Sequence, residues 1–151
     1  MSARVTLYTR DDLYRGVYGP PELQALGSNP FIEQTGADDR AAPTLTSLSF
    51  DPAPGGVLVR IGVRDDRAGP STMSSYGTGP GGAWQPGIEF RNEPVSGTRH
   101  NGIWEQWMPT PPGTVEVDMI ELSDTLNNFR VYRAPALQAM GLPTSFTVPP
   151  G

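Results

Sequence analysis

Apolar and polar residues alternate with a period of two along much of this chain, which is typical of β-strands buried on one face. In the stretch 57–64 every second residue is valine or isoleucine. The stretch 114–122 repeats the pattern, with Val115, Val117 and Met119 on one face and acidic residues on the other. We therefore predict two long strands, each with one face in the core.

Shorter segments with the same pattern predict further strands, separated by turn residues. They lie at residues 4–9, 14–18, 44–50, 88–91, 102–107 and 129–133, the last as a hairpin partner of 114–122. Short helices are predicted at 20–26 and 134–140, because prolines open each segment and glycine follows it. The fold class is all-β: a sandwich or Greek-key barrel of short antiparallel strands with long Gly/Pro-rich loops and an extended C-terminal arm.

Glycine and proline interrupt the pattern often, with 18 glycines and 17 prolines among 151 residues. They concentrate in the stretch 69–87, which we predict to be a long surface loop carrying Met73, Tyr76 and Trp84. Loops of this length are usually functional or held by a partner. The loop is therefore a candidate contact surface.

The last part of the chain is predicted to be an extended arm. Prolines exclude a helix in residues 142–151, while Leu142, Phe146 and Val148 are apolar enough to anchor the segment. The length suits one domain. We expect a β domain over 1–133, followed by a short helix and the C-terminal arm over 134–151.

Composition and charge narrow the function. The chain has no cysteine, which excludes disulfides, thiol catalysis and cysteine-bound zinc. Its formal charge is -5 and all its basic residues other than His are arginine, so nucleic acids and anionic membranes are poor partners. No apolar run approaches the roughly 18 residues of a membrane helix, and residues 1–5 contain no apolar signal core. The exclusive use of arginine is typical of a high-GC genome.

Few residues fit a catalytic or metal site. His100 is the single histidine, and no Gly-x-Ser-x-Gly motif accompanies it as a nucleophile. The acidic pairs Asp11–Asp12, Asp38–Asp39 and Asp65–Asp66 fit turns better than calcium loops, although calcium binding stays open. The glycine-rich stretch 77–82 lacks the lysine of a phosphate loop. We expect no enzyme activity, no cofactor and no metal.

The aromatic residues have two interpretations. Trp84, Trp104 and Trp107 with Tyr76 form either a sugar-stacking platform or a set of protein-interface anchors, and we favour anchors because tryptophan and tyrosine are enriched at interfaces. Trp104 and Trp107 are three residues apart, which places them on opposite faces of a strand. The complete set of expected interface residues is Met73, Tyr76, Trp84, Trp104, Trp107, Arg130, Arg133, Leu142, Phe146 and Val148.

Part of the chain resembles the Greek-key motif of the βγ-crystallins. The resemblance rests on the stretch 5–8, on Tyr14, Arg15 and Gly16, and on the later stretch 46–48. The spacing from Tyr8 to Tyr14 is one residue longer than in that family. Six residues separate Asp38–Asp39 from Thr46–Ser47 where the family's calcium motif has two. The resemblance therefore implies the fold motif and not the calcium site.

In general character the chain is similar to accessory structural proteins of tailed bacteriophages of high-GC hosts, which include capsid decoration proteins and small tail proteins. The shared features are a small β-rich chain without cysteine or lysine, long loops and a proline-rich arm. The resemblance implies a virion protein assembled in the host cytoplasm. Its partners would be other virion or assembly proteins, including further copies of itself as a homo-oligomer. The alternative is a small β-sandwich module that binds calcium or a glycan.

Overall fold

The computed structural model describes residues 5–8, 14–18 and 40–151, and the chain forms two compact units, residues 1–38 and 39–151. In the first unit, the two segments predicted as strands form β1 (Val5–Tyr8) and β2 (Tyr14–Tyr18), which pair antiparallel. The helix predicted at 20–26 lies outside the described residues. The helix and arm predicted at 134–151 lie within the second unit.

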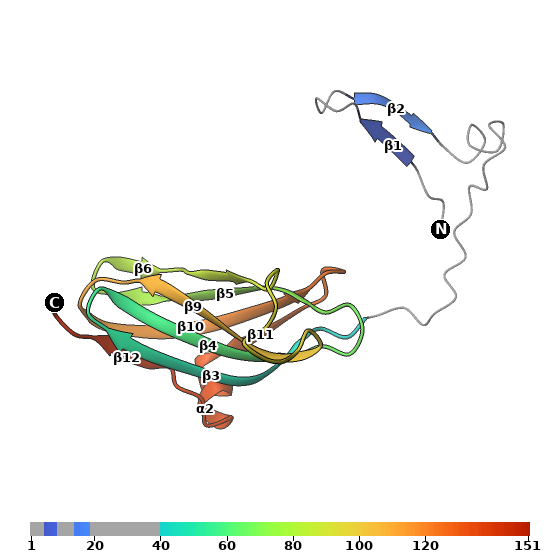
Figure 1. Cartoon of the computed structure of the whole chain (residues 1–151). Helices are drawn as coiled ribbons and strands as arrows, with labels where there is room; N and C mark the ends of the chain where they lie inside the picture. Colours follow the sequence, from blue (N-terminus) through green and yellow to red (C-terminus); the bar gives the residue numbers. More distant parts are fainter. Residues whose placement is uncertain (1–4, 9–13, 19–39) are drawn as a thin grey trace. The chain divides into compact units, whose positions relative to one another are not determined.

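The second unit is an all-β structure of two layered antiparallel sheets, which agrees with the predicted fold class (Figure 1). The larger sheet has the order β11 (Phe129–Arg133), β10 (Gly113–Asp124), β5 (Pro70–Gly79), β6 (Gly82–Trp84), with β12 (Ser145–Val148) also paired to β10 and β7 (Gly87–Glu89) also paired to β5. The smaller sheet has the order β3 (Thr44–Ala53), β4 (Gly56–Arg64), β9 (Asn101–Pro109), β8 (Ser96–Thr98). One short helix, α2 (Ala134–Ala139), follows β11.

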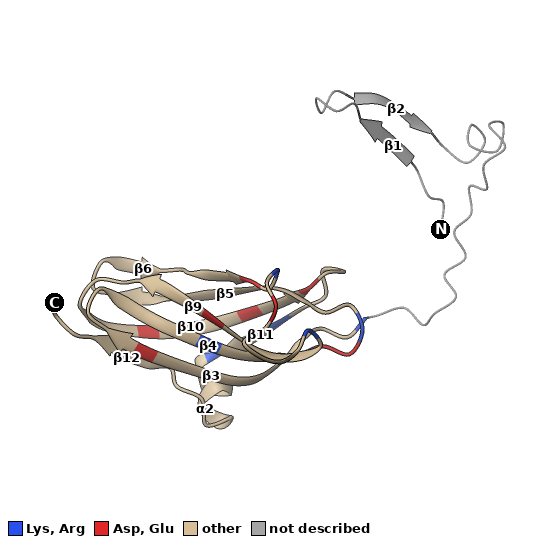
Figure 2. Ribbon diagram, in the orientation of Figure 1, with Lys and Arg blue, Asp and Glu red and all other residues tan. Residues whose placement is uncertain are grey.

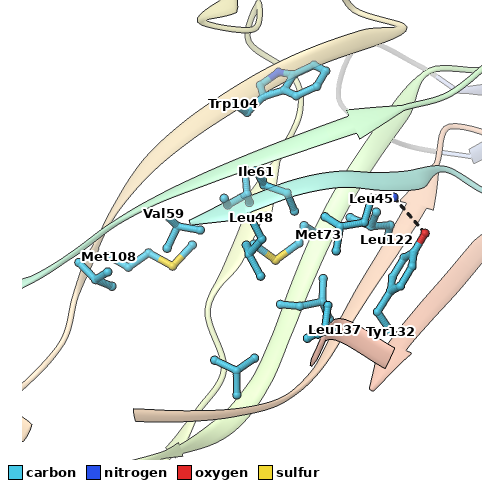
Figure 3. Close-up of a cluster of buried hydrophobic side chains, with 14 of the residues drawn as sticks. Leu45, Leu48, Val59, Ile61, Met73, Trp104, Met108, Leu122, Tyr132 and Leu137 are labelled. Atoms are coloured by element: carbon cyan, nitrogen blue, oxygen red, sulfur yellow. Dashed lines mark hydrogen bonds between the residues drawn. The ribbon is translucent and has the colours of Figure 1, made fainter. Parts of the chain in front are cut away.

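The hydrophobic core lies between the two sheets and follows the predicted alternation. All four apolar residues of the alternating series in β4 are fully buried. Figure 3 shows Met73 and Leu122 of the larger sheet pointing toward the layer that holds Leu45 and Leu48. The backbone N–H of Leu45 donates to the Tyr132 hydroxyl at 3.0 Å, so a hydrogen bond also joins the two sheets at one side.

The predicted face of β10 is correct for its first half only. Val115 and Val117 are buried, but the register with β5 shifts between Val117 and Met119. This β-bulge inserts one extra residue and reverses the face that points inward. Ile120 and Leu122 are buried beyond it, and Met119 is not.

The prediction of a long loop at 69–87 is wrong. The segment forms β5, the two-residue turn Pro80–Gly81, β6 and the start of β7. The inward positions of β5 include Ser75 and Gly77, and because neither is a large apolar residue the period of two is hidden. A Cβ on Gly77 would lie 2.2 Å from the Glu116 carbonyl oxygen, so glycine is required for the close pairing with β10.

The C-terminal segment is not a free arm. β12 adds to β10, with Phe146 opposite Val115 and Val148 opposite Gly113. The Phe146 ring stacks on Phe50 of β3 with ring centroids 4.8 Å apart. The buried side chains of Phe146 and Val148 therefore hold β12 against its own domain.

Candidate interaction surface

Four segments that are distant in sequence meet at one end of the sandwich. They are the turn Pro54–Gly55, the turn Pro80–Gly81, the loop 110–112 and the last residues 149–151 (Figure 1). The Thr110 N–H donates to the Gly55 carbonyl at 3.2 Å, which joins the first turn to the loop. The pairing of Val148 with Gly113 brings the last residues beside the same loop.

This end, which we call the uncharged end, has no ionisable side chain. The ribbon is tan in its loops, whereas most red and blue residues lie elsewhere and gather toward the opposite end (Figure 2). The segments without any Asp, Glu, Arg, Lys or His are 52–59, 78–88, 106–115 and 146–151. By contrast, the connection from β4 to β5 at the other end contains Asp65, Asp66 and Arg67. The domain is therefore strongly asymmetric in charge along its length.

The uncharged end is also rigid. A Cβ on Gly113 would lie 2.3 Å from Cγ of Pro80, which shows how closely the two connections approach. Gly113 has φ +129°, a conformation that L residues rarely adopt. Proline fixes its own φ. Exposed prolines at this end are Pro52, Pro54, Pro80, Pro109, Pro111, Pro112 and Pro150.

A shallow cavity of about 370 Å³ opens at the uncharged end between residues 79–86 and 109–111. At this site the Trp84 Nε1–H donates to the buried Thr110 hydroxyl at 3.3 Å. The Trp84 ring also contacts Phe146 edge-on, at a centroid distance of 5.4 Å. The cavity therefore has an aromatic base and a rim of proline and glycine.

Trp107 is the large exposed aromatic side chain beside this end, with 45% of its surface accessible. Its ring lies against Gly56 on the outer face of the smaller sheet, where a Cβ on that glycine would come within 2.7 Å of a ring carbon. Any side chain at position 56 would therefore overlap the indole of Trp107.

An ion-pair network crosses the same outer face over three strands. Arg60 of β4 contacts Glu105 of β9 at 2.5 Å and also contacts Asp51 of β3. The hydrogen bond from Arg60 to Glu105, with the attraction of both carboxylates, raises the pKa of the guanidinium. All three side chains stay partly exposed, so the network adds little to the free energy of unfolding.

Half of the predicted interface residues are buried in the core, although Trp84 among them also lines the cavity at the uncharged end. The reason in each case is that the side chain points between the sheets. Trp104, for example, is buried and donates its Nε1–H to the Asn92 carbonyl at 2.9 Å. The buried set is Met73, Trp84, Trp104, Phe146 and Val148.

The other predicted residues are at least partly accessible but do not form one patch. Arg130 and Arg133 are exposed on β11, and Arg130 donates to the Thr44 hydroxyl at 3.2 Å. Tyr76 and Leu142 are half-buried. Register places Tyr76 and Arg133 on either side of Met119 across the larger sheet, on a different face from Trp107.

Sequence reasoning missed the uncharged end and several exposed apolar residues. Phe129, at 67% accessibility, and Leu126 lie in or beside the connection from β10 to β11. The lack of charge in each turn is visible in the sequence. The meeting of these turns at one end follows from the sheet topology, which the sequence does not reveal.

Within the described residues, the candidate chemical groups lie in connections at the end opposite the uncharged end. His100 is exposed in the turn between β8 and β9. Among residues 40–151 and the two N-terminal strands, no three His, Cys, Asp or Glu side chains are grouped for metal binding. Asp65 and Asp66 share a depression with Arg64 and Arg130, whose positive charges oppose a bound cation.

Calcium binding by the other acidic pairs and sugar stacking by the aromatic residues are the two remaining alternatives. The pairs Asp11–Asp12 and Asp38–Asp39 lie outside the described residues. A sugar-stacking platform of several aromatic rings is not formed, because Trp84 and Trp104 are buried and Trp107 alone of the tryptophans is exposed.

Comparison of the chain with protein-family models, with curated proteins and with solved structures gives no significant match. Within the described residues, none of the helices has the length and apolar character needed to cross a bilayer.

Proposed function

We propose that this protein is a structural assembly protein that attaches to neighbouring protein subunits through its uncharged end. The observation that carries the proposal is the convergence of four uncharged, proline-rich segments around a cavity at one end of an otherwise acidic chain. Docking a surface without charged side chains avoids the free-energy cost of removing such side chains from water at an interface.

Rigidity and shape support the same function. Because proline and closely packed glycine already fix the backbone, little conformational entropy is lost when this end is buried. The cavity is large enough to take an apolar side chain from a partner. Its lining has no ionisable group that would act as a general acid or base, which favours binding over catalysis.

In its most specific form, the proposal is an accessory virion protein of a tailed bacteriophage, either a capsid decoration protein or a minor head or tail component. The support for this form is the general character of the chain: small, rich in β-strands, and free of cysteine and lysine. The partners would then be other virion proteins, including further copies of this chain.

The test introduces one charge at the uncharged end of the full chain. Pro111→Glu places a carboxylate on the rim of the cavity, and Leu126→Glu places the same charge on an exposed apolar residue elsewhere as a control. Tagged chains are expressed in the cells that make the protein, and the extracts are sedimented through a density gradient. We expect the unmodified chain and Leu126→Glu in a heavy fraction and Pro111→Glu in the light fraction.

Two results would contradict the proposal. One is a light fraction for the unmodified chain, which would show that it is not part of an assembly. The other is co-sedimentation of Pro111→Glu with the unmodified chain. Circular dichroism of the purified variants confirms that each keeps its β-structure.

A further inference from the structure

Strand β9 has an open edge over about half of its length. β8 pairs with Asn101–Ile103 and extends no further. In the described part of the chain no other strand pairs with residues 104–108 on that side. Exposed strand edges invite pairing with another strand, and natural proteins usually cover or protect them.

The direction of the backbone groups on this edge follows from two hydrogen bonds. The Ile103 carbonyl accepts from the Val95 N–H at 2.7 Å, on the β8 side. Thr110 donates its N–H to Gly55 on the opposite side. Because these groups alternate along a strand, Glu105 and Trp107 direct their N–H and C=O groups toward the open edge.

We propose that a second copy of this chain adds its own β9 to this edge in antiparallel orientation. The open stretch is bounded by Ile103, which is paired to β8, and by Pro109, which has no N–H to donate. Its midpoint is Gln106. A two-fold axis through Gln106 therefore aligns the two open stretches over their whole length, with each Glu105 opposite Trp107 of the second copy.

Compared with shifts in either direction, this register makes more backbone hydrogen bonds and avoids repulsion between like charges. Each pair of Glu105 with the second copy's Trp107 exchanges two N–H···O bonds, because both residues direct their groups to the edge. A shift in one direction places the two Glu105 carboxylates opposite each other, which is unfavourable. A shift in the other direction places Glu105 opposite Pro109, which cannot donate.

The same register brings residues of the outer face together across the new junction. Trp107 lies on the outer face of the smaller sheet, and so does Glu105 with its partner Arg60. Pairing places Glu105 of each copy directly across from Trp107 of the other copy on this outer face, while each indole lies over Gly56 of its own β4. The contact is isologous, as closed two-fold dimers require.

This inference rests on the proposed function, because it names one neighbouring subunit as a second copy of the chain. It uses the open edge of β9, which adjoins the uncharged end at Pro109. The smaller sheets of two copies would join into one continuous sheet in the order β3, β4, β9, β9, β4, β3.

A cysteine scan of the full chain tests both the contact and its register. The natural chain has no cysteine, so one introduced thiol is the only one present. On the two-fold axis the two Gln106 residues form a non-hydrogen-bonded pair with Cα atoms about 4.5 Å apart, a distance that a disulfide spans. Gln106 is exposed, so Gln106→Cys does not disturb the core.

We expect Gln106→Cys to form a disulfide-linked dimer under mild oxidation, at least about ten times faster than the neighbouring controls Glu105→Cys and Trp107→Cys. In this register the Cα atoms of each control pair lie roughly 8–9 Å apart, beyond the reach of a disulfide. We also expect the unmodified chain to sediment as a dimer at high concentration.

Faster linking of either control would overturn the register, and equal slow linking of all three would overturn the contact. A monomeric unmodified chain would do the same. The proposed function does not depend on these results. It is supported if Pro111→Glu moves from the heavy to the light fraction of the gradient, so failure of the β9 contact can be distinguished from failure of the proposed function.

Discussion

Asp65 and Asp124 accept the same pattern of backbone hydrogen bonds in two neighbouring connections, β4 to β5 and β10 to β11. In each case one carboxylate oxygen accepts the backbone N–H groups of the residues two and four positions later. The two connections are joined by a hydrogen bond from the Thr125 N–H to the Gly69 carbonyl at 3.2 Å. The charged end of the sandwich is therefore built around two buried carboxylates, with exposures of 4% and 1%.

The two aspartates differ in their second oxygen, which leads to a prediction. Oδ2 of Asp124 accepts from the Asn128 side chain at 2.7 Å, whereas Oδ2 of Asp65 is buried without a partner. Asp124→Ala leaves one more donor unpaired, and Asp65→Ala also removes an unpaired oxygen. We expect Asp124→Ala to lower the free energy of unfolding by about 1–3 kcal/mol more than Asp65→Ala does.

Urea unfolding of the two variants and the unmodified chain measures this difference. Both variants should be destabilised, since each loses hydrogen bonds to a charged acceptor. Equal losses, or a larger loss for Asp65→Ala, would show that the second oxygen does not distinguish the two sites.

A second prediction concerns the C-terminal strand as part of the core. Phe146 is buried and stacks on Phe50, whereas its neighbour Thr147 is exposed on the same strand. We expect Phe146→Ala to lower the free energy of unfolding by about 3–5 kcal/mol, because the change leaves a cavity in the core. Thr147→Ala serves as the control, with an expected loss of less than about 1 kcal/mol. Thermal unfolding that is unchanged in Phe146→Ala would mean that β12 does not stabilise the domain.

A third prediction tests the rigidity of the uncharged end. Gly113→Ala introduces a Cβ against Pro80 at a φ of +129°, so backbone strain and steric overlap act together. We expect a loss of about 2 kcal/mol or more in the free energy of unfolding. Gly81→Ala is the matched control in the facing turn, where the new Cβ would lie 3.9 Å from Pro111. If both substitutions are tolerated equally in denaturant unfolding, the close approach of the two connections is not a constraint.

The strands that the sequence predicts best are those whose inward positions carry large apolar residues. β4 has valine or isoleucine at every second position, and its prediction is confirmed. β5 was missed because Ser75 and Gly77 occupy inward positions; the strand is paired on both edges. The bulge in β10 after Val117 was missed for a related reason, since a one-residue insertion leaves no mark in composition.

The candidate surface was less predictable than the fold. The spacing of Trp104 and Trp107 correctly indicates opposite faces, because one is buried and the other exposed. The spacing does not reveal which of them faces inward. Glycine and proline in the turns Pro54–Gly55 and Pro80–Gly81 predict turns, but only the order of the strands brings the two turns to the same end.

The last prediction uses the unequal exposure of the three tryptophans. The rings of Trp84 and Trp104 are buried and hydrogen-bonded, whereas Trp107 is exposed. A polar quencher such as acrylamide should therefore reach mainly Trp107. We expect Trp107→Phe to lose most of the quenchable fluorescence and to shift the remaining emission to shorter wavelength. If Trp107→Phe is quenched as strongly as the unmodified chain, a buried tryptophan must open to solvent.

The same measurement connects to the pairing of β9. If a second copy covers Trp107, the disulfide-linked Gln106→Cys dimer should be quenched less than the same variant after reduction and dilution. The reduced variant keeps all three tryptophans, so the comparison changes only the covering of the edge. Quenching that is equal in the two states would show that the second copy does not cover the indole where it lies over Gly56.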